Sequence, residues 1–494
     1  MINLKVTLQM AETVFYKLNA EVPPSYMGKL FDYIYSQYLI PQKQRFNNID
    51  RETSAQADYL AYTIIDAQGK QLVKVEVKSG NPIEITLTPV DPSVSAQVIE
   101  EAKQDIIIST QIFRENTRKA TVYFAWREGE EVVPEAYTKP EKSFNRLFLE
   151  TQALFFLVFI LFGAGIIIPL TAFYPSLIWV APILLIGIQF IFVLFSSNII
   201  ARTADWKITQ DNPIIHFLEY YLPVDQEADF IKKYSREQLL AIKKEIYDKI
   251  LTERGEVDCA SAQQIFLKHG VPCQLENLKT KKVNVYEKVK NIADRFGFPM
   301  PKIVVSNTMI PNAAATGPSP SRGMVLITTG LLVRLEEDEI LSVLGHEFGH
   351  LKGRDPLILY GLVSAQYLFQ FYVLFRFFPF IFSSFLLLII YFWVVMVGIF
   401  FIAKFFEARA DLVSAIMVGT PQILAGSLEK IGFQRLLYER TPSYRIQEWI
   451  GLDPHPPIYF RVDRLEKLSS EKIKHPLIQS IRDVIRGFIA TLKG

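Results

Sequence analysis

This 494-residue sequence has few cysteines and a small net charge. Its two cysteines, Cys259 and Cys273, are too few for a disulfide framework and suit a reducing compartment. The formal net charge is +2, which argues against a nucleic-acid-binding protein because such domains are usually strongly basic. Charged residues make up 21% of the chain, whereas 50% are hydrophobic and 37 are Phe. These values exclude a disordered chain, a coiled coil and a small disulfide-rich domain, and they indicate a membrane protein with substantial soluble parts.

Two long segments carry almost no charge. Residues 147–198 contain one charged residue, Glu150, and residues 357–403 contain only Arg376. Each segment is divided near its middle by a turn, the second at Phe378-Pro379. The halves are about 20 residues long, which is the length that an α-helix needs to cross the hydrocarbon core of a membrane. We therefore predict four transmembrane helices arranged as two hairpins.

Basic residues flank both hairpins on the side of the longer soluble segments. Under the positive-inside rule, this asymmetry places both termini and the central segment in the cytoplasm. Residues 1–10 contain no signal-peptide core, so export of the N-terminal part by that route is not expected. The flanking residues are Lys139, Lys142, Arg146, Arg202, Lys207, Lys352, Arg354, Lys404 and Arg409.

The soluble segments have different predicted secondary structures. Residues 1–145 read as a separate α+β domain without a catalytic motif, for which a docking or regulatory role is the simplest interpretation. Residues 199–283 read as a helical cytoplasmic region, with one helix after the capping box that begins at Ser235 and another from Asp258. In the N-terminal domain we predict strands at 59–64, 72–77, 83–87 and 120–126 and a helix at 95–108.

The segment His346-Glu347-Phe348-Gly349-His350 is the strongest chemical signal. It lies near the end of the predicted helix 338–352, whose apolar residues recur at helical spacing. Because His346 and His350 are four residues apart, they project from one face of the helix and can bind one Zn²⁺. Glu347 points too far round the helix to join them, and it can act as the general base toward a water at the open coordination position.

A third protein ligand must come from elsewhere in the chain. The metzincin pattern would need a histidine where Pro356 stands. After the last predicted span, Glu407 and Asp411 are four residues apart on one helix face, where the second hairpin returns to the side of the histidines. We predict that Glu407 is the third ligand and that Asp411 is an acceptor that orients a ligand imidazole.

Taken together, these motifs resemble the HtpX-type membrane metalloproteases, which are relatives of the CAAX prenyl endopeptidases. The resemblance covers roughly residues 146–200 and 284–470, and four predicted spans fit the HtpX layout. Four motifs occur in the order of the family: Asn312-Ala313-Ala314-Ala315, the His346–His350 helix, the Glu407–Asp411 segment, and His455-Pro456-Pro457 with Arg461.

The resemblance implies two further roles. Asn312, Ala313, Ala314 and Ala315 would lie on an edge strand that pairs with an extended peptide substrate. His455 would stabilise the oxyanion of the tetrahedral intermediate, although the family often has Ser-x-His where this chain has Asp453-Pro454-His455. One Zn²⁺ per chain is the expected cofactor.

The predicted fold is an α-helical membrane protein with four transmembrane helices, a zincin catalytic domain of the gluzincin type (α+β) in the cytoplasm, and an N-terminal α+β soluble domain. The predicted parts are the N-terminal domain 1–145, hairpin 146–198, helical region 199–283, catalytic part 284–356 with the two histidines, hairpin 357–403, and C-terminal catalytic part 404–494 with the third ligand.

The leading hypothesis for function is a zinc endopeptidase, embedded in the lipid bilayer, that cleaves misfolded or surplus membrane proteins at the cytoplasmic face. One alternative is a dedicated protease for lipidated or single membrane substrates, selected by the N-terminal domain. Another is an inactive membrane scaffold or adaptor, which has no need for an intact set of zinc ligands and a general base.

Overall fold

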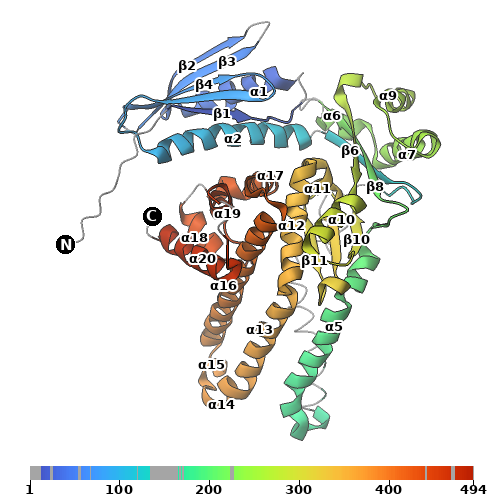
Figure 1. Ribbon diagram of the computed structural model, residues 1–494, viewed down its shortest axis with the longest axis vertical. Coiled ribbons are helices and arrows are strands. Elements are labelled where there is room, and N and C mark those ends of the chain that lie inside the picture. The colour runs from blue at the N-terminus through green and yellow to red at the C-terminus, as the bar shows by residue number, and fades with distance from the viewer. Residues whose placement is uncertain are drawn as a thin grey trace. The chain divides into compact units, whose positions relative to one another are not determined.

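The computed structural model describes most of the chain, and its chain path is shown in Figure 1. The described residues are 13–22, 26–53, 57–66, 68–119, 121–133, 172–222, 227–439, 442–468 and 473–492, with Gly165 and Pro169. They form two compact units. The first comprises Met1–Val122, Glu219–Ser235 and Cys273–Lys279, and the second comprises Tyr123–Leu218, Arg236–Pro272 and Thr280–Gly494.

The first unit is built on a five-stranded antiparallel sheet with the order β1-β5-β4-β3-β2. Its strands alternate inward and outward residues: Val73, Val75 and Val77 of β4 are buried, whereas Lys74 is exposed. Helix α2 packs against this sheet and closes the core. The elements are β1 (Val14–Leu18), α1 (Met27–Tyr33), η2 (Ile34–Leu39), η3 (Ile40–Gln42), β2 (Phe46–Thr53), β3 (Asp58–Ile65), β4 (Gln71–Lys78), β5 (Ile83–Pro89), α2 (Ala96–Lys119) and α6 (Glu227–Lys233).

The strands predicted at 59–64, 72–77 and 83–87 are confirmed as β3, β4 and β5. The helix predicted at 95–108 is longer and ends at Lys119. The strand predicted at 120–126 forms as β6 (Thr121–Arg127), but it pairs with β8 instead of joining the N-terminal sheet. The first segment of the N-terminal unit therefore ends at Val122, and the unit also takes in Glu219–Ser235 and Cys273–Lys279.

The second unit contains a four-stranded mixed sheet with the order β11-β12-β10-β7. Its central strands β10 and β12 are parallel, and β11 is antiparallel to β12 at one edge. Apolar residues of the strands pack against α10 and α12, so the core of this unit lies between the sheet and the helix of the two histidines. The elements are β7 (Trp206–Ile208), α10 (Val285–Phe296), β10 (Lys302–Ser306), β11 (Ala313–Thr316), η8 (Pro320–Arg322), β12 (Met324–Thr328), α11 (Thr329–Arg334) and α12 (Glu337–Gly353).

The prediction of a helical region at 199–283 is only partly right. The two predicted helices form, the first after Ser235 and the second with Asp258 as its N-cap. The region also supplies three strands, β7, β8 (Ile214–Tyr221) and β9 (Leu278–Asn284), which the sequence does not reveal because β8 is buried on both faces and lacks alternation. Its other elements are α7 (Arg236–Ile246), η6 (Tyr247–Leu251), α8 (Thr252–Arg254), α9 (Cys259–Lys268) and η7 (Leu275–Asn277).

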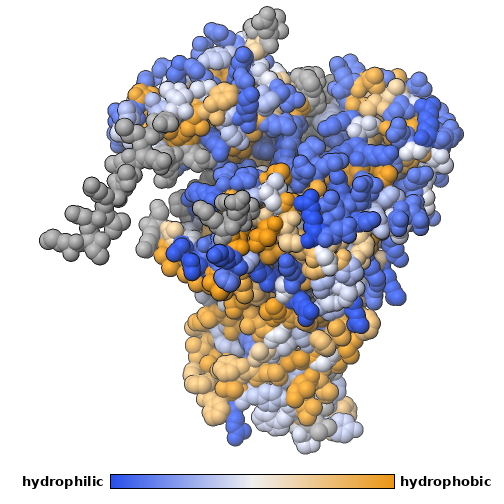
Figure 2. Space-filling view, viewed as in Figure 1, coloured by the Kyte–Doolittle hydropathy of each residue, from blue (hydrophilic) through white to orange (hydrophobic). Residues whose placement is uncertain are grey.

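Three helical stretches among the described residues are long and apolar enough to cross a membrane: Ile178–Phe195, Asp355–Phe377 and Phe385–Val418. The last two are the predicted second hairpin, and the chain turns at Phe378-Pro379 as predicted. Figure 2 shows apolar side chains gathered over the end of the molecule that these helices form. The elements are η4 (Pro175–Val180), α5 (Ala181–Thr203), α13 (Asp355–Phe369), η9 (Gln370–Leu374), α14 (Phe375–Phe377), α15 (Phe380–Ser383) and α16 (Phe385–Val418).

Apart from Gly165 and Pro169, the predicted first span between residues 147 and 170 lies outside the described residues, so the number of four spans stays a prediction. After α16 the described residues form four more helices, which lie across α12 from strands β10 and β11 (Figure 1). These helices are α17 (Pro421–Glu439), α18 (Pro442–Ile450), α19 (Ile458–Glu466) and α20 (Pro476–Leu492).

Candidate metal centre and active site

Helices α12 and α16 approach each other closely, and this brings their polar side chains together. A Cβ atom at Gly349 would lie 3.0 Å from the Cα of Ala410, and one at Gly345 would lie 2.8 Å from Ser414 Oγ. A larger residue at Gly349 would therefore require the backbone of α16 to shift, whereas at Gly345 the close atoms belong to the side chains of Ser414 and Val418. The helix predicted over 338–352 is confirmed as α12, with a capping box between Glu336 and Glu339 at its start.

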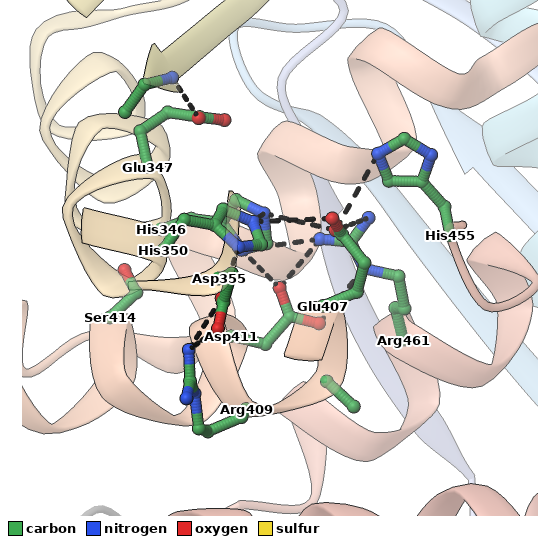
Figure 3. A network of polar contacts seen from close by, with 12 residues as sticks. His346, Glu347, His350, Asp355, Glu407, Arg409, Asp411, Ser414, His455 and Arg461 are labelled. Carbon is green, nitrogen blue, oxygen red and sulfur yellow. Dashed lines mark hydrogen bonds and ion pairs between the residues drawn. The ribbon is translucent and has the colours of Figure 1, made fainter. Parts of the chain in front are cut away.

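Three side chains from these two helices converge on one point, as Figure 3 shows. The Nε2 atoms of His346 and His350 are 3.2 Å apart. The carboxylate of Glu407 lies 3.3 Å from each of these nitrogens, through Oε2 toward His346 and through Oε1 toward His350. His346, His350 and Glu407 thus form a group whose donor atoms lie within 4.8 Å of one another.

The donor set fits a zinc ion. Three ligand atoms at about 2.0–2.1 Å from a tetrahedral zinc would be roughly 3.3 Å from one another, which is the spacing found here. Glu407 Oε2 is buried and accepts no hydrogen bond from the described residues, which is costly unless a cation is bound there. Two imidazoles and a carboxylate also leave a fourth position open, as in catalytic zinc sites.

Each of the two histidines is oriented by a carboxylate on its other ring nitrogen. His346 Nδ1 lies 2.8 Å from Asp411 Oδ1, and His350 Nδ1 lies 2.8 Å from Asp355 Oδ2. Arg461 donates to Asp411 from Nε at 2.9 Å and from Nη2 at 2.7 Å. Arg409 donates to Asp355 at 2.6 Å. These contacts fix both imidazoles with their Nε2 atoms toward the shared point.

The surroundings of the histidines favour positive charge. Burial lowers the pKa of His346, but its hydrogen bond with Asp411 and its close contact with the Glu407 carboxylate outweigh burial and raise that pKa to about 10. For His350, burial also opposes the charged form, and the charge of Glu407 and the hydrogen bond to Asp355 raise its pKa. The pocket therefore stabilises a cation at the point that the three donor atoms surround.

Glu347 lies next to the edge strand of the mixed sheet. Its Oε2 accepts a hydrogen bond from the Ala315 backbone N–H at 2.8 Å, and Ala315 belongs to β11. The strand predicted from Asn312 forms as Ala313–Thr316 at the sheet edge, with Asn312 directly before it, hydrogen-bonded through its backbone N–H to Thr328 Oγ1. Strand residues Ala313, Ala314 and Ala315 are thus close to the side chain that the sequence selects as the general base.

His455 reaches the same site from the loop before α19. Its Nε2 lies 3.6 Å from Glu407 Oε2, and its side chain is 44% exposed. Asp453, which stands where the family often has serine, accepts hydrogen bonds at 2.8 Å from both the Nδ1 and the backbone N–H of His455. Arg435 in turn binds Asp453 at 3.0 Å. The aspartate therefore takes over the positioning of the imidazole.

The structure places the side chains of six residues close together, with Ala315 of the edge strand beside them, and it adds two residues that the sequence patterns do not assign to the site. The six are His346, Glu347, His350, Glu407, Asp411 and His455. Asp355 carries no role in the sequence motifs, and its contact with His350 becomes visible only in the fold. Arg409 was counted only as a membrane-flanking charge, although its guanidinium holds Asp355. Arg461 was noted as part of a motif without a role. A sequence signal for such orienting carboxylates is their position shortly after a ligand residue. Asp411 is four residues after Glu407, and Asp355 is five residues after His350, at the start of the next helix.

Comparison with known proteins matches residues 279–469 to a family described as Peptidase family M48. A Protease HtpX homolog of Gemmatimonas aurantiaca is 32% identical over 215 residues, which cover 38% of this chain and 76% of that protein. The chain belongs to peptidase family M48. A Protease HtpX homolog of Tropheryma whipplei is 29% identical over 216 residues, covering 38% of this chain and 73% of that protein.

Other relatives align with this M48 member over a shorter segment. A Protease HtpX homolog of Sulfurihydrogenibium is 46% identical over 74 residues, which is 15% of this chain and 25% of that protein. Among solved structures, Ste24p of S. mikatae aligns with 48% of this chain, and the alignment covers 65% of the Ste24p chain. The two chains are 18% identical in sequence, with a TM-score of 0.29. The predicted resemblance to HtpX-type metalloproteases is confirmed, and the chain is a membrane protein of the protease class.

Proposed function

We propose that this M48 member is a zinc endopeptidase that hydrolyses peptide bonds of membrane proteins close to the cytoplasmic surface of the membrane. The observation that carries this proposal is the convergence of His346, His350 and Glu407 beside Glu347, which itself touches an edge strand. Ligands, general base and a peptide-binding edge within one site are what peptide hydrolysis requires.

The proposed reaction uses residues that are already positioned. His346, His350 and Glu407 would hold the zinc ion, which would polarise the scissile carbonyl and lower the pKa of a bound water. The Glu347 carboxylate takes the proton of the attacking water and delivers it to the leaving amine. The His455 imidazole, held by Asp453, lies on the far side of Glu407 and can donate a hydrogen bond to the developing oxyanion.

Substrate binding is proposed at the free edge of β11. An extended peptide that pairs with this strand would be held by main-chain hydrogen bonds, so binding would depend little on the substrate sequence. The strand residues are only partly buried, and Ala313 and Ala315 pack against the core of the unit. The Ala315 N–H, which now donates to Glu347, is one of the groups that such a substrate would face.

The distance from the site to the membrane supports membrane proteins as substrates. Glu407 lies only about 6 Å along the helix axis beyond Ala403, the last residue of the second predicted hairpin. A bond cleaved at this site would therefore lie near the membrane surface. The basic residues that flank the hairpins support a cytoplasmic position for this surface. Removal of misfolded or surplus membrane proteins is the role that agrees with both features.

The test is the Glu347→Gln variant with Glu337→Gln as its matched control on the same helix. We expect Glu347→Gln to retain zinc and to lose cleavage of an unfolded membrane protein, with a rate reduced by a factor on the order of 10² to 10⁴. Glu337 is exposed at the helix start, so the control should cleave normally. Unchanged cleavage by Glu347→Gln would refute the mechanism.

The substrate class needs a separate experiment. Proteins retained by the Glu347→Gln form in isolated membranes, compared with those retained by the native chain, would identify bound substrates. A varied set of damaged membrane proteins would support quality control. Recovery of lipidated proteins alone would favour a dedicated protease, and recovery of one unprocessed partner in both samples would favour a scaffold.

A further inference from the structure

Helix α20 has one packed face and one exposed face. Ser480 and Val484 are fully buried against the rest of the second unit. On the opposite side, Ile478 is 59% exposed, Ile489 is 44% exposed and Leu492 is 55% exposed. Ile485, at 40%, lies on the same side. Because a helix turns by about 100° per residue, these four apolar side chains fall within roughly 60° of arc and form one stripe.

Basic side chains border this apolar stripe. Arg482 and Arg486 are exposed, and their positions on the helix follow the stripe on one side. No described residue of α20 on that border is acidic, since the single carboxylate of the helix, Asp483, pairs with Arg464 on the packed side. An apolar stripe bordered by arginine is the pattern of helices that lie in a membrane interface.

The packed face of α20 fixes where the helix lies along α16. The Phe488 ring is 5.4 Å from the Phe401 ring, and Val484 shares a buried cluster with Ala408. Residues 385–403 of α16 rise about 28 Å along the helix axis. The hydrocarbon core of a bilayer is roughly 30 Å thick. If Phe385 lies at one boundary, the other boundary falls between Phe401 and Phe405, where α20 packs.

We propose that α20 is an interfacial helix whose stripe of Ile478, Ile485, Ile489 and Leu492 inserts into the bilayer that α16 spans. Arg482 and Arg486 then lie at the level of the headgroups and bind anionic lipid. This arrangement would help to fix the active site relative to the membrane, because the packed face of α20 contacts α19, which in turn contacts the helix of Glu407. Arg464 of α19 donates to Asp483 at 2.9 Å and to the Ala408 carbonyl, next to Glu407, at 2.7 Å.

The position of the stripe can be measured with a fluorescent label in the full-length protein. The background replaces both native cysteines, Cys259→Ser and Cys273→Ala, and single cysteines at Ile485→Cys or Ile489→Cys carry the label NBD. Ala490→Cys is the matched control, because Ala490 is exposed but lies about 100° round the helix from Ile489, beyond the two arginines. The protein is reconstituted in vesicles of phosphatidylcholine and phosphatidylglycerol in equal parts, and retained proteolysis shows that each variant is folded.

The expected result is quenching from inside the bilayer. A lipid nitroxide near the headgroup end of the acyl chain should remove about half or more of the emission at 485 and 489, as for a group that lies 5–10 Å into the boundary. Aqueous iodide should quench the label at 490 and leave these two protected. Equal iodide quenching at all three positions would overturn the proposal. Protection from both quenchers would also overturn it, because the stripe would then be covered by protein.

The lipid charge has its own test. Omitting phosphatidylglycerol, or combining Arg482→Gln with Arg486→Gln, should reduce lipid quenching at 485, and the two changes together should have no larger effect than either alone. Quenching that is insensitive to both changes would overturn the assignment of an anionic headgroup to the two arginines.

Discussion

Replacing Asp355 with Asn should weaken zinc binding, although Asp355 is not one of the proposed ligands. Its Oδ2 accepts a hydrogen bond from His350 Nδ1 at 2.8 Å and another from Arg409 at 2.6 Å. The Asp355 side chain is only 4% exposed. Asparagine keeps one acceptor oxygen but places an amide group against a neighbouring donor. If the amide oxygen takes the place of Oδ2, the amide nitrogen meets Arg409, which also contacts Oδ1 at 2.5 Å; in the reverse orientation it meets both His350 and Arg409. Either orientation loses at least one of these hydrogen bonds.

The size of the effect follows from this loss. Removing an acceptor that orients a ligand histidine typically costs a factor of about 10–100 in metal affinity. This corresponds to about 1.4–2.8 kcal/mol of binding free energy. Asp411→Asn should weaken zinc binding similarly, but its partner Arg461 also lies 3.8 Å from Glu407, so this change would disturb a second proposed ligand. Asp355→Asn is therefore the cleaner change.

The assay is competition between the purified protein and a chromogenic chelator at fixed pH, which gives the zinc dissociation constant. Asp338→Asn on the exposed start of α12 is the control, because it makes the same chemical change away from the site. Thermal unfolding with excess zinc shows whether the variant still folds. A folded Asp355→Asn protein with native zinc affinity would refute the orienting role.

Three further changes test other parts of the account. Glu407→Ala should reduce the zinc content measured by mass spectrometry to near zero, and full zinc content would show that another residue is the third ligand. Gly349→Ala should lower the free energy of unfolding by about 1–3 kcal/mol in urea, because the new Cβ would lie 3.0 Å from Ala410 Cα. Gly361→Ala is the control and should leave the stability unchanged, because its new Cβ meets no atom of the described residues within 4 Å. Burial and the charge of Lys282 lower the pKa of the His216 side chain from the ordinary 6.5 to about 4. Between these two pH values the unfolded chain binds a proton at His216 and the folded chain does not, so the stability of the fold decreases as the pH falls from 6.5 to 4. His216→Phe should remove about 3 kcal/mol of this loss between pH 7 and pH 4, which unfolding at both pH values would detect.

The sequence predicted the site better than it predicted the surrounding fold. His346, Glu347 and His350 follow from local spacing on one helix, and Glu407 follows because a transmembrane hairpin must return to its starting side. Asp355 could not be found in this way, since its contact depends on the left-handed conformation of Arg354, which ends α12 and starts α13. Local patterns are blind to such a turn.

The missed strands have a different physical reason. β8 is buried on both faces, so its residues do not alternate, and β7 is only three residues long. The N-terminal strands β3 to β5 were predictable because each has one buried and one solvent-facing side. The sheet that β6 joins could not be predicted, because strand pairing across a long sequence separation leaves no mark in either segment.

X-ray absorption at the zinc edge tests the central claim, one zinc held by His346, His350 and Glu407, most directly. The account predicts one zinc per chain with a shell of nitrogen and oxygen at about 2.0–2.1 Å and outer scattering from two imidazoles. The same spectrum is expected for Glu347→Gln. A sulfur shell at about 2.3 Å, which would implicate Cys259 or Cys273, or a purified active protein without zinc, would contradict it.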